Sequence, residues 1–181
     1  FLKGKDLPTG QVVGKKDAES AMAYSAVFAC NRVLAETLAS CPIFLYEKTD
    51  TGRKKADHRL HDLLHYAPCP DMTPTAFKEA GVGNINFGGN FYVQKVKNIK
   101  GEVIQLRPIQ WSRVKVKVDQ QTGGLLYYVD NADVPMTRAD ILHIPGLTLD
   151  GYIGITPLEY AQATLNIGIS QDTFQQFQST H

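Results

Sequence analysis

The most regular alternation of apolar and polar residues lies between Asn90 and Val118. Residues 91–96 alternate along the chain, residues 98–101 interrupt the pattern, and an extended pattern resumes over residues 103–106. Two extended runs joined by a short turn that contains glycine predict a β-hairpin. Pro108 has no backbone N–H group to donate to a neighbouring strand, so we expect pairing to end there.

A third strand is predicted directly after this hairpin, because valines alternate with Lys115 and Lys117 from Val114 to Val118. This alternation is typical of a strand with one face buried and the other in water. The three runs together predict a β-meander, and further strands are expected at residues 125–129 and 140–144.

A long amphipathic helix is predicted for residues 18–40, with Pro42 just beyond its end. Arg32 and Glu36 are four residues apart and are expected to pair on its surface. A short strand over residues 43–47 and a charged turn should follow. Five residues at helical spacing make up the apolar stripe of this helix: Val27, Cys30, Leu34, Leu38 and Cys41.

A second long helix is predicted to begin at Pro74, with Thr73 as its N-cap. It should run to about Phe87 and end at the two glycines that follow. The segment before it, APCPDMTPT, is expected to be an extended linker because its prolines disfavour helix.

Three histidines, His58, His61 and His65, fall on one face of a short predicted helix between these two. Three imidazoles on one face could bind a metal ion. The opposite face of the same helix is apolar, however, so the histidines are interpreted as its outward side. That apolar face consists of Leu60, Leu63 and Leu64.

The strongest local signal for a helix start is the segment ITPLEY. Thr156 can cap the helix, Pro157 fits its first position, and Glu159 can complete a capping box. Beyond Ser170 the sequence becomes rich in glutamine and has no clear end signal, which suggests that the chain is a fragment of a longer protein. The apolar stripe of this last helix is Leu158, Ala161, Leu165 and Ile169.

Together these elements predict an α+β fold, in which helices pack on a small, mostly antiparallel β-meander that is followed by a long helix. The expected organisation is a flexible arm over residues 1–17, an α+β domain over residues 18–150 and a helical segment over residues 151–181.

A chain of 181 residues, 43% of them hydrophobic, can form one sizeable core. No apolar run approaches the roughly 18 to 20 residues of a membrane-spanning helix. The three cysteines lack CxxC spacing, so neither a zinc site nor a disulfide framework is expected.

Charge is distributed unevenly along the chain. All 19 Lys and Arg residues lie at or before Arg138, although the formal net charge is only +1. The segment from Ala139 to His181 contains no basic residue and four acidic ones, so the last part of the chain is mildly acidic.

No catalytic residues, cofactor site or metal site are predicted. The run GQVVGKK does not have the spacing of a phosphate-binding loop. Asp140 and His143 could form half of a catalytic dyad, but no Ser or Cys nucleophile is placed to complete it. We therefore interpret His143 as a hydrogen-bonded structural residue.

Four segments, in order, resemble a known protein family: AVFACNRVLAETLASCPIFLYEK, HRLHDLLHYAPCPDMT, GGNFYVQKVKNIKGEVIQLRPI and ADILHIPGLTLDGYIGITPLEYA. They resemble the portal proteins of tailed bacteriophages, in the branch found in many long-tailed phages and prophages. The similarity covers about residues 18–170. Cys69 departs from the family, which often has Asn between two prolines. The family also continues well past His181.

This resemblance implies a structural subunit of a dodecameric ring at one vertex of the phage head, through which DNA enters during packaging and leaves during ejection. Residues 18–150 would correspond to the peripheral wing and residues 151–181 to the start of the stem. The implied partners are further copies of the subunit, the terminase motor, a head-tail adaptor, the capsid protein and translocating double-stranded DNA, without a membrane. The implied locations are the virion and, during assembly, the host cytoplasm.

The uncharged polar tail has a physical interpretation within such a ring. Each Lys or Arg that contacts phosphate adds salt-dependent affinity, which would resist the movement of DNA. We therefore expect Gln171, Gln175 and Gln178 to form a channel face that contacts DNA weakly. The alternative is an ordinary helix exposed to solvent.

A nucleic-acid-binding β module is the main alternative function. Lys115 and Lys117 should project from the same strand face, with Arg107 and Arg113 near them in sequence. Lysines on a strand face also discourage edge-to-edge pairing of sheets, and the near-neutral total charge argues against a dedicated nucleic-acid binder.

Overall fold

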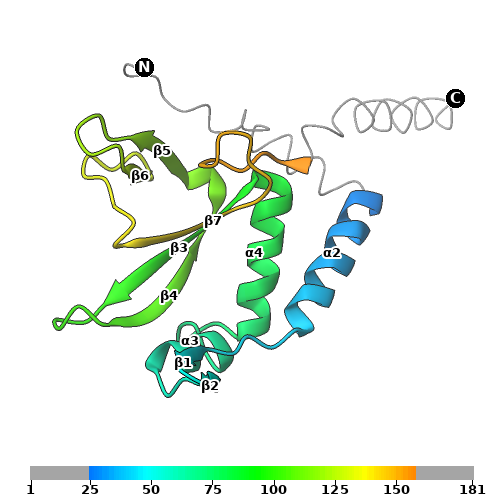
Figure 1. Cartoon of the computed structure of the whole chain (residues 1–181). Helices are drawn as coiled ribbons and strands as arrows, with labels where there is room; N and C mark the ends of the chain where they lie inside the picture. Colours follow the sequence, from blue (N-terminus) through cyan, green and yellow to red (C-terminus); the bar gives the residue numbers. More distant parts are fainter. Residues whose placement is uncertain (1–24, 158–181) are drawn as a thin grey trace, which may run out of the picture.

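The computed structural model describes residues 25–157, shown in Figure 1. Helices and strands alternate in groups, and strands dominate after residue 89. In chain order the elements are α2 (Ser25–Ser40), β1 (Tyr46–Thr49), β2 (Gly52–Lys55), α3 (Arg59–His65), α4 (Pro74–Gly88), β3 (Asn90–Lys97), β4 (Val103–Ile109), the 3-10 helix η1 (Trp111–Arg113), β5 (Val114–Val118), β6 (Leu125–Val129) and β7 (Ile141–Pro145).

The predicted α+β fold is confirmed, but the order of the strands differs from the predicted meander. Strand β3 is central in a three-stranded antiparallel sheet of order β4-β3-β7, and β5 pairs with β6 in a separate sheet. The predicted hairpin is β3 and β4, whereas the third strand of their sheet is β7 and not β5. Periodicity reports that a strand is half-buried, but it does not identify the strand's neighbour.

Pro108 does not end the pairing of β4, contrary to the expectation. It lies opposite Val93, and Ile109 still pairs with Tyr92. Strand β4 is at the edge of its sheet, where a missing N–H group can face away from the neighbouring strand.

The two faces of β3 contribute to two apolar clusters. Phe91 and Val93 pack with Phe77 of α4, and the Phe77 and Phe91 ring centroids lie 5.4 Å apart. Tyr92 points to the opposite face and belongs to a cluster that includes residues of the β5–β6 sheet and β7. That second cluster consists of Tyr92, Ile109, Val114, Val116, Leu125, Tyr127, Ile141 and Ile153.

The start and end of α4 agree with the sequence prediction. The Thr73 side-chain oxygen accepts a hydrogen bond from the backbone N–H of Ala76 at 3.1 Å, and Pro74 is the first helical residue. Gly89 ends the helix in the left-handed conformation, with φ of 68°. These are contacts within one helical turn, which is why the local sequence predicts them.

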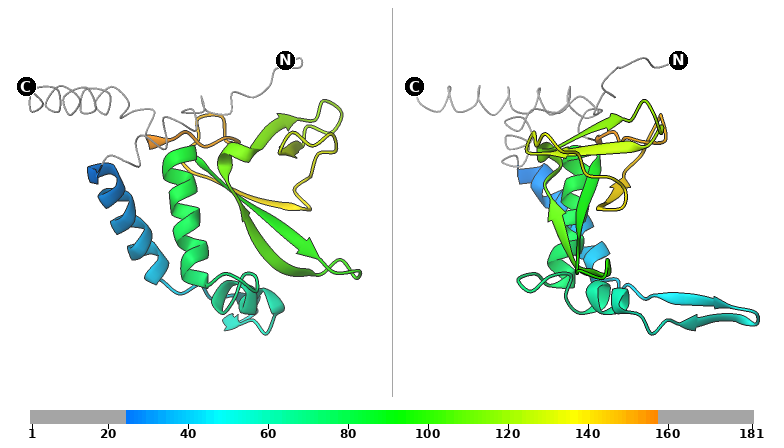
Figure 2. Two further views of the ribbon diagram at one scale, coloured as in Figure 1. Left: turned by 180° about the vertical axis from the view of Figure 1, so that it is seen from behind. Right: turned by 90° about the vertical axis from the view of Figure 1, so that its left-hand side faces the viewer.

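Helix α2 lies beside α4, as Figures 1 and 2 both show. It packs through Ala35 and Ala39, which are 6% and 2% exposed, and the Asn86 side chain donates a hydrogen bond to the Asn31 side chain at 2.9 Å. The predicted apolar stripe is therefore not the packed face, because Leu34 and Leu38 remain more than half exposed. The Arg32–Glu36 pair forms as predicted, with N and O atoms 3.1 Å apart. The part of the predicted helix before Ser25 lies outside the described residues.

The charged segment after α2 is a hairpin rather than a strand followed by a turn. Strand β1 begins at Tyr46, three residues later than predicted, and pairs with β2, which occupies the predicted charged turn. In the side view of Figure 2 this hairpin extends away from the rest of the described chain. Its strands are almost entirely exposed, so burial does not fix their ends.

The predicted domain boundary after residue 150 falls within the packed structure. Ile153 is 3% exposed and belongs to the same cluster as Tyr92. Residues 151–156 therefore pack with the α+β domain, and the predicted helix beyond Pro157 lies outside the described residues. Among residues 25–157, no helix is long and apolar enough to cross a membrane.

Candidate functional site

The most highly connected polar group of the described chain is the buried side chain of Asn90, at the start of β3. Its amide nitrogen donates to the carbonyl oxygens of Gly88 at 3.1 Å and Gly154 at 3.0 Å. Its amide oxygen accepts from the backbone N–H of Gly154 at 2.8 Å and lies 2.9 Å from Nε2 of His143. One side chain thus joins the end of α4, strand β7 and the segment that leads to Pro157. We call this set of contacts the Asn90 junction.

These contacts assign the proton on His143. Because the Asn90 oxygen can only accept, Nε2 of His143 carries the hydrogen and donates it. Nδ1 is then the acceptor, and it lies 3.3 Å from the Tyr127 hydroxyl group, which donates. Burial, and secondarily the positive charge of Arg138, lower the pKa of His143 to about 4. The imidazole therefore stays neutral near pH 7. Both of its ring nitrogens are hydrogen-bonded within the domain, in agreement with its interpretation as a hydrogen-bonded structural residue.

At the Asn90 junction, the backbone segments around Gly89, Gly146 and Gly154 also lie very close to one another. The N–H of Gly146 donates to the carbonyl oxygen of Gly89 at 2.8 Å. A Cβ atom on Gly154 would lie 1.8 Å from that same oxygen and 2.6 Å from the Gly146 nitrogen. Glycine is therefore required at residue 154 by space, because three backbone segments meet where a side chain would be.

The junction leads directly to the point where the described chain ends. The side-chain hydroxyl of Thr156 donates to the carbonyl oxygen of Asn86 at 3.3 Å, so the last described residues are attached to α4. Thr156 is 2% exposed. The arrangement therefore fixes the position of the last described residues against α4.

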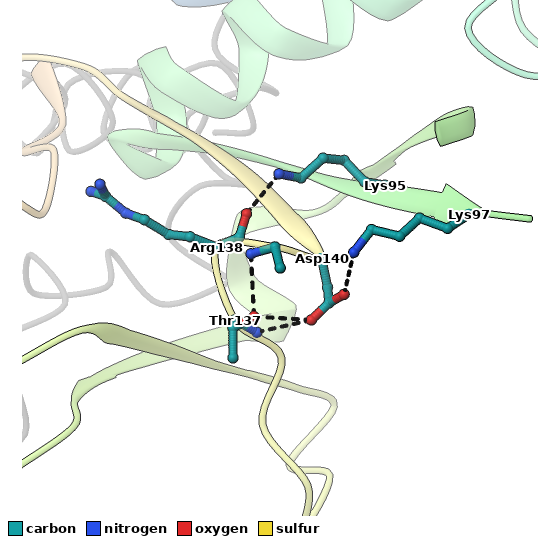
Figure 3. A network of polar contacts seen from close by, with 6 residues as sticks. Lys95, Lys97, Thr137, Arg138 and Asp140 are labelled. Atoms are coloured by element: carbon teal, nitrogen blue, oxygen red, sulfur yellow. Dashed lines mark hydrogen bonds and ion pairs between the residues drawn. The ribbon is translucent and has the colours of Figure 1, made fainter. Parts of the chain in front are cut away.

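The catalytic dyad considered from the sequence does not form. The carboxylate of Asp140 lies 2.9 Å from Nζ of Lys97 and accepts hydrogen bonds from Thr137, as Figure 3 shows. Lys95 donates to the backbone carbonyl of Arg138 at 2.6 Å in the same network. Hydrogen bonding to Lys97 is the main cause that lowers the pKa of Asp140. This network attaches β3 to the turn before β7, which is a structural role.

The three histidines at α3 have two different environments, since His58 is its N-cap whereas His61 and His65 lie within the helix. Nδ1 of His58 accepts a hydrogen bond from the backbone N–H of Leu60 at 3.1 Å and so caps the helix. His61 and His65 stack on each other with 5.1 Å between ring centroids, and Phe44 stacks on His65 at the same distance. Both rings are half-buried. The prediction that the histidines form the outward side of the helix is therefore wrong for these two, because Phe44 in the segment before β1 stacks on both rings.

No group of three or more metal-binding side chains occurs within residues 25–157. The three histidines therefore do not form a metal site in this part of the chain.

The predicted basic stripe is only partly assembled. Lys115 and Lys117 are exposed on β5 as expected, while Val114 and Val116 are buried. Arg113 forms an ion pair with Asp130, and Arg107 lies on β4, which belongs to a different sheet. Two lysines without the expected arginines provide little of the positive potential that a nucleic-acid binder uses.

The side chains at Gln171, Gln175 and Gln178 lie outside the described residues.

Sequence reasoning missed the roles of Asn90, Gly146 and Gly154. One feature of the sequence could have indicated the role of Asn90: it is a polar residue that directly follows two glycines and begins an apolar strand. An amide side chain that is buried at such a position needs hydrogen-bond partners.

A change of pH tests the environment assigned to His143. Its folded pKa of about 4 is below the ordinary value, so between pH 6.5 and 4 the unfolded chain binds a proton that the folded chain does not. The free energy of unfolding should therefore fall as the pH falls through this interval, and His143→Gln should reduce that slope. Urea unfolding at several pH values measures both slopes. Equal slopes in the two proteins would contradict the assignment.

The site is a structural junction in an α+β domain, and comparisons with known proteins assign that domain to a family. The chain belongs to the phage portal protein family, whose sequence profile matches residues 25–178. The portal protein of Enterobacteria phage HK97 is 28% identical over 160 residues, which cover 87% of this chain and 38% of the HK97 protein. Protein BeeE of Escherichia coli (strain K12) is 39% identical over 105 residues, which cover 58% of this chain and 64% of BeeE.

Solved structures confirm the fold. A chain in the neck of an empty gene transfer agent particle, computed with C6 symmetry, matches with a TM-score of 0.75 and 20% sequence identity. The match covers 96% of this chain and 48% of that chain. The present chain thus spans less than half the length of this neck protein and of the HK97 portal protein.

Proposed function

We propose that the full-length protein is a structural subunit of a portal ring at the capsid vertex and carries out no bond chemistry. The observation that carries this proposal is the family match over residues 25–178. Two further observations support it: the fold is shared with a chain in the neck of a gene transfer agent particle, and the described polar side chain with the most hydrogen bonds belongs to a structural junction. The ring would be the conduit for DNA during packaging and ejection.

Within this ring, the α+β domain would form the peripheral wing, and the chain beyond Pro157 would begin the stem. The Asn90 junction supports this division because it anchors the chain at the point where the stem would start. The arm expected over residues 1–17 lies outside the described residues.

The proposed partners follow from the same role. The subunit would bind further copies of itself in a dodecameric ring. The neck of a native gene transfer agent particle, which contains a chain of similar fold, was computed with C12 symmetry. The capsid protein, the terminase motor and a head-tail adaptor would dock on the ring. The protein would be present in the host cytoplasm during assembly and afterwards in the virion.

The mass of the full-length protein in solution tests the proposal. Native mass spectrometry or light scattering should find a large closed ring. A full-length protein that stays monomeric at every concentration and ionic strength tested would contradict it. The mass of this shorter chain is the second measurement: if the full-length protein forms a ring and this chain is monomeric, contacts essential for assembly lie outside residues 1–181.

The proposed channel face is tested by charge. Lysine at Gln171, Gln175 and Gln178 of the full-length protein should slow DNA packaging, because each new cation that reaches phosphate adds affinity. Higher salt should partly restore the rate. Glutamate at the same three residues is the matched control and should not slow packaging in this salt-dependent way. Unchanged packaging with the lysine variant would remove support for a weak-contact channel.

A further inference from the structure

The hairpin of β1 and β2 separates its charges onto two faces. Residues that lie directly opposite each other in an antiparallel pair share a face, and so do alternate residues along one strand. Lys48 lies opposite Arg53, and Tyr46 lies opposite Lys55. These three cations and one tyrosine therefore occupy the same side of the hairpin, which we call the basic hairpin face.

The other face of the hairpin is neutralised within the hairpin itself. There Glu47 lies opposite Lys54, and the Lys54 ammonium group is 3.5 Å from the Glu47 carboxylate. Thr49 and Gly52 complete that face and carry no charge. Asp50 belongs to the turn between the strands and is exposed. The acidic residues of the hairpin are thus kept off the face that carries its three cations.

The positive charge of the basic hairpin face is not compensated within the described part of the chain. Neither Lys48 nor Arg53 forms an ion pair with any residue from 25 to 157. The Lys55 ammonium group lies over the Phe44 ring, 4.7 Å from its centroid, which is a contact that keeps the charge. Like charges directly opposite each other destabilise a strand pair. An anionic partner that contacts Lys48 and Arg53 together would relieve this repulsion.

The basic hairpin face is accessible, and its base is held in place. Every strand residue of the hairpin except Thr49 is exposed, and Figure 2 shows the hairpin extending away from the rest of the described chain. At the base, the N–H of Ala56 donates to the carbonyl oxygen of Leu45 at 3.0 Å. Phe44 stacks on His65 of α3 with 5.1 Å between ring centroids. The cations are therefore presented from a fixed base.

The two ends of the sequence carry little charge that could neutralise this face. Residues 1–24 contain four lysines and three acidic residues, and residues 158–181 contain two acidic residues. Neither segment has a run of acidic residues that matches three cations. Charge complementarity therefore points to a partner other than these segments.

We propose that the basic hairpin face binds the phosphate backbone of double-stranded DNA without sequence preference. The shape fits, because the major groove of B-DNA admits a two-stranded β-ribbon. The composition fits as well, because Lys and Arg are common phosphate contacts, whereas the centre of a protein interface is depleted of charge. This site is additional to the proposed ring and does not depend on it, because each subunit carries the whole face.

Neutralising this face in the full-length protein tests the proposal. Lys48→Gln with Arg53→Gln removes two cations together with their mutual repulsion, so the fold should be retained, which circular dichroism checks. Fluorescence anisotropy with a mixed-sequence duplex of about 30 base pairs should show affinity about tenfold weaker at low salt. The slope of log affinity against log salt should become shallower by about two, because two phosphate contacts are lost.

A matched control removes the same charge elsewhere. Lys54→Gln with Lys100→Gln neutralises one lysine on the other hairpin face and one exposed lysine in the turn between β3 and β4. It should change DNA affinity by less than about twofold. Unchanged affinity in the variant of Lys48 and Arg53 would overturn the inference. Equal weakening in both variants would also overturn it, because the binding would then follow overall charge.

Acetylation of lysines in the unmodified full-length protein gives a readout that needs no variant. Adding the same duplex should protect Lys48 from the reagent and leave Lys54 and Lys100 as reactive as before. This result decides the matter if the glutamine variant does not fold. Equal reactivity of Lys48 with and without DNA would overturn the inference. Protection of Lys48 before DNA is added would overturn it too, because a protein segment would then cover the face.

The outcome is separate from that of the proposed ring. A full-length protein that stays monomeric would contradict the ring, while its DNA affinity and the protection of Lys48 would still decide this inference. A ring whose Lys48 is unprotected by DNA would leave the proposed function intact and remove the binding site.

Discussion

Replacing Gly154 with alanine should destabilise the folded protein by about 3 to 5 kcal/mol. The added methyl group would lie 1.8 Å from the carbonyl oxygen of Gly89, so the two backbone segments must separate. Separation disrupts the hydrogen bond between Gly146 and Gly89 and both contacts of the Asn90 side chain to Gly154. Chemical denaturation followed by the fluorescence of Trp111, which is the single tryptophan of the sequence, measures the change.

Gly83→Ala is the matched control for this prediction. Gly83 lies inside α4, and a Cβ atom built there meets nothing within 4 Å. Alanine in a helix interior should be neutral or should stabilise the protein by about 0.5 to 1 kcal/mol. If both alanine variants had the same stability as the unmodified protein, the close approach at Gly154 would not be the reason for its glycine.

Replacing Asn90 with aspartate should destabilise the protein by roughly 3 to 5 kcal/mol, although the two side chains have nearly the same shape. Asn90 is 4% exposed, and its amide nitrogen faces the carbonyl oxygens of Gly88 and Gly154. An aspartate oxygen in that position would place one acceptor against two others and bury a negative charge. The loss should shrink at low pH, where the carboxyl group can bind a proton and donate again.

An exposed asparagine provides the control for the second prediction. Asn131 lies in the turn after β6, is exposed and has a positive φ of 58°, which aspartate also tolerates. Asn131→Asp should therefore change stability by only a few tenths of a kcal/mol. A similar small loss for Asn90→Asp would show that the four hydrogen bonds of its side chain contribute little to stability.

The extent to which the sequence predicted the structure differs between elements for a physical reason. The N-cap of α4, the hairpin of β3 and β4 and the buried valines of β5 were predicted because their contacts join residues close in sequence or follow a simple period. The packed side of α2 was not predicted. Five apolar residues at helical spacing indicate an apolar face, but they do not determine which side of the helix contacts α4. There, small alanines allow close packing, and the larger side chains remain outside.

The candidate site was predicted least well. His143 was correctly interpreted as structural, but its partner Asn90 was not recognised, and the two are 53 residues apart in the chain. Gly154 is 64 residues from Asn90, and its glycine is required only by the backbone segments that meet there. No local pattern encodes such a contact.

The sequence by itself determined the α+β class, most of the helices and strands, and the resemblance to portal proteins. These follow from hydrogen bonds within single turns, from the periods of helices and strands, and from the order of several conspicuous segments. The tertiary structure alone decided that β7 joins β3, that α2 packs through its alanines, and that Asn90 connects α4 to the departing chain. These features depend on burial and on the pairing of polar groups between segments far apart in sequence, which exist only once the chain has folded.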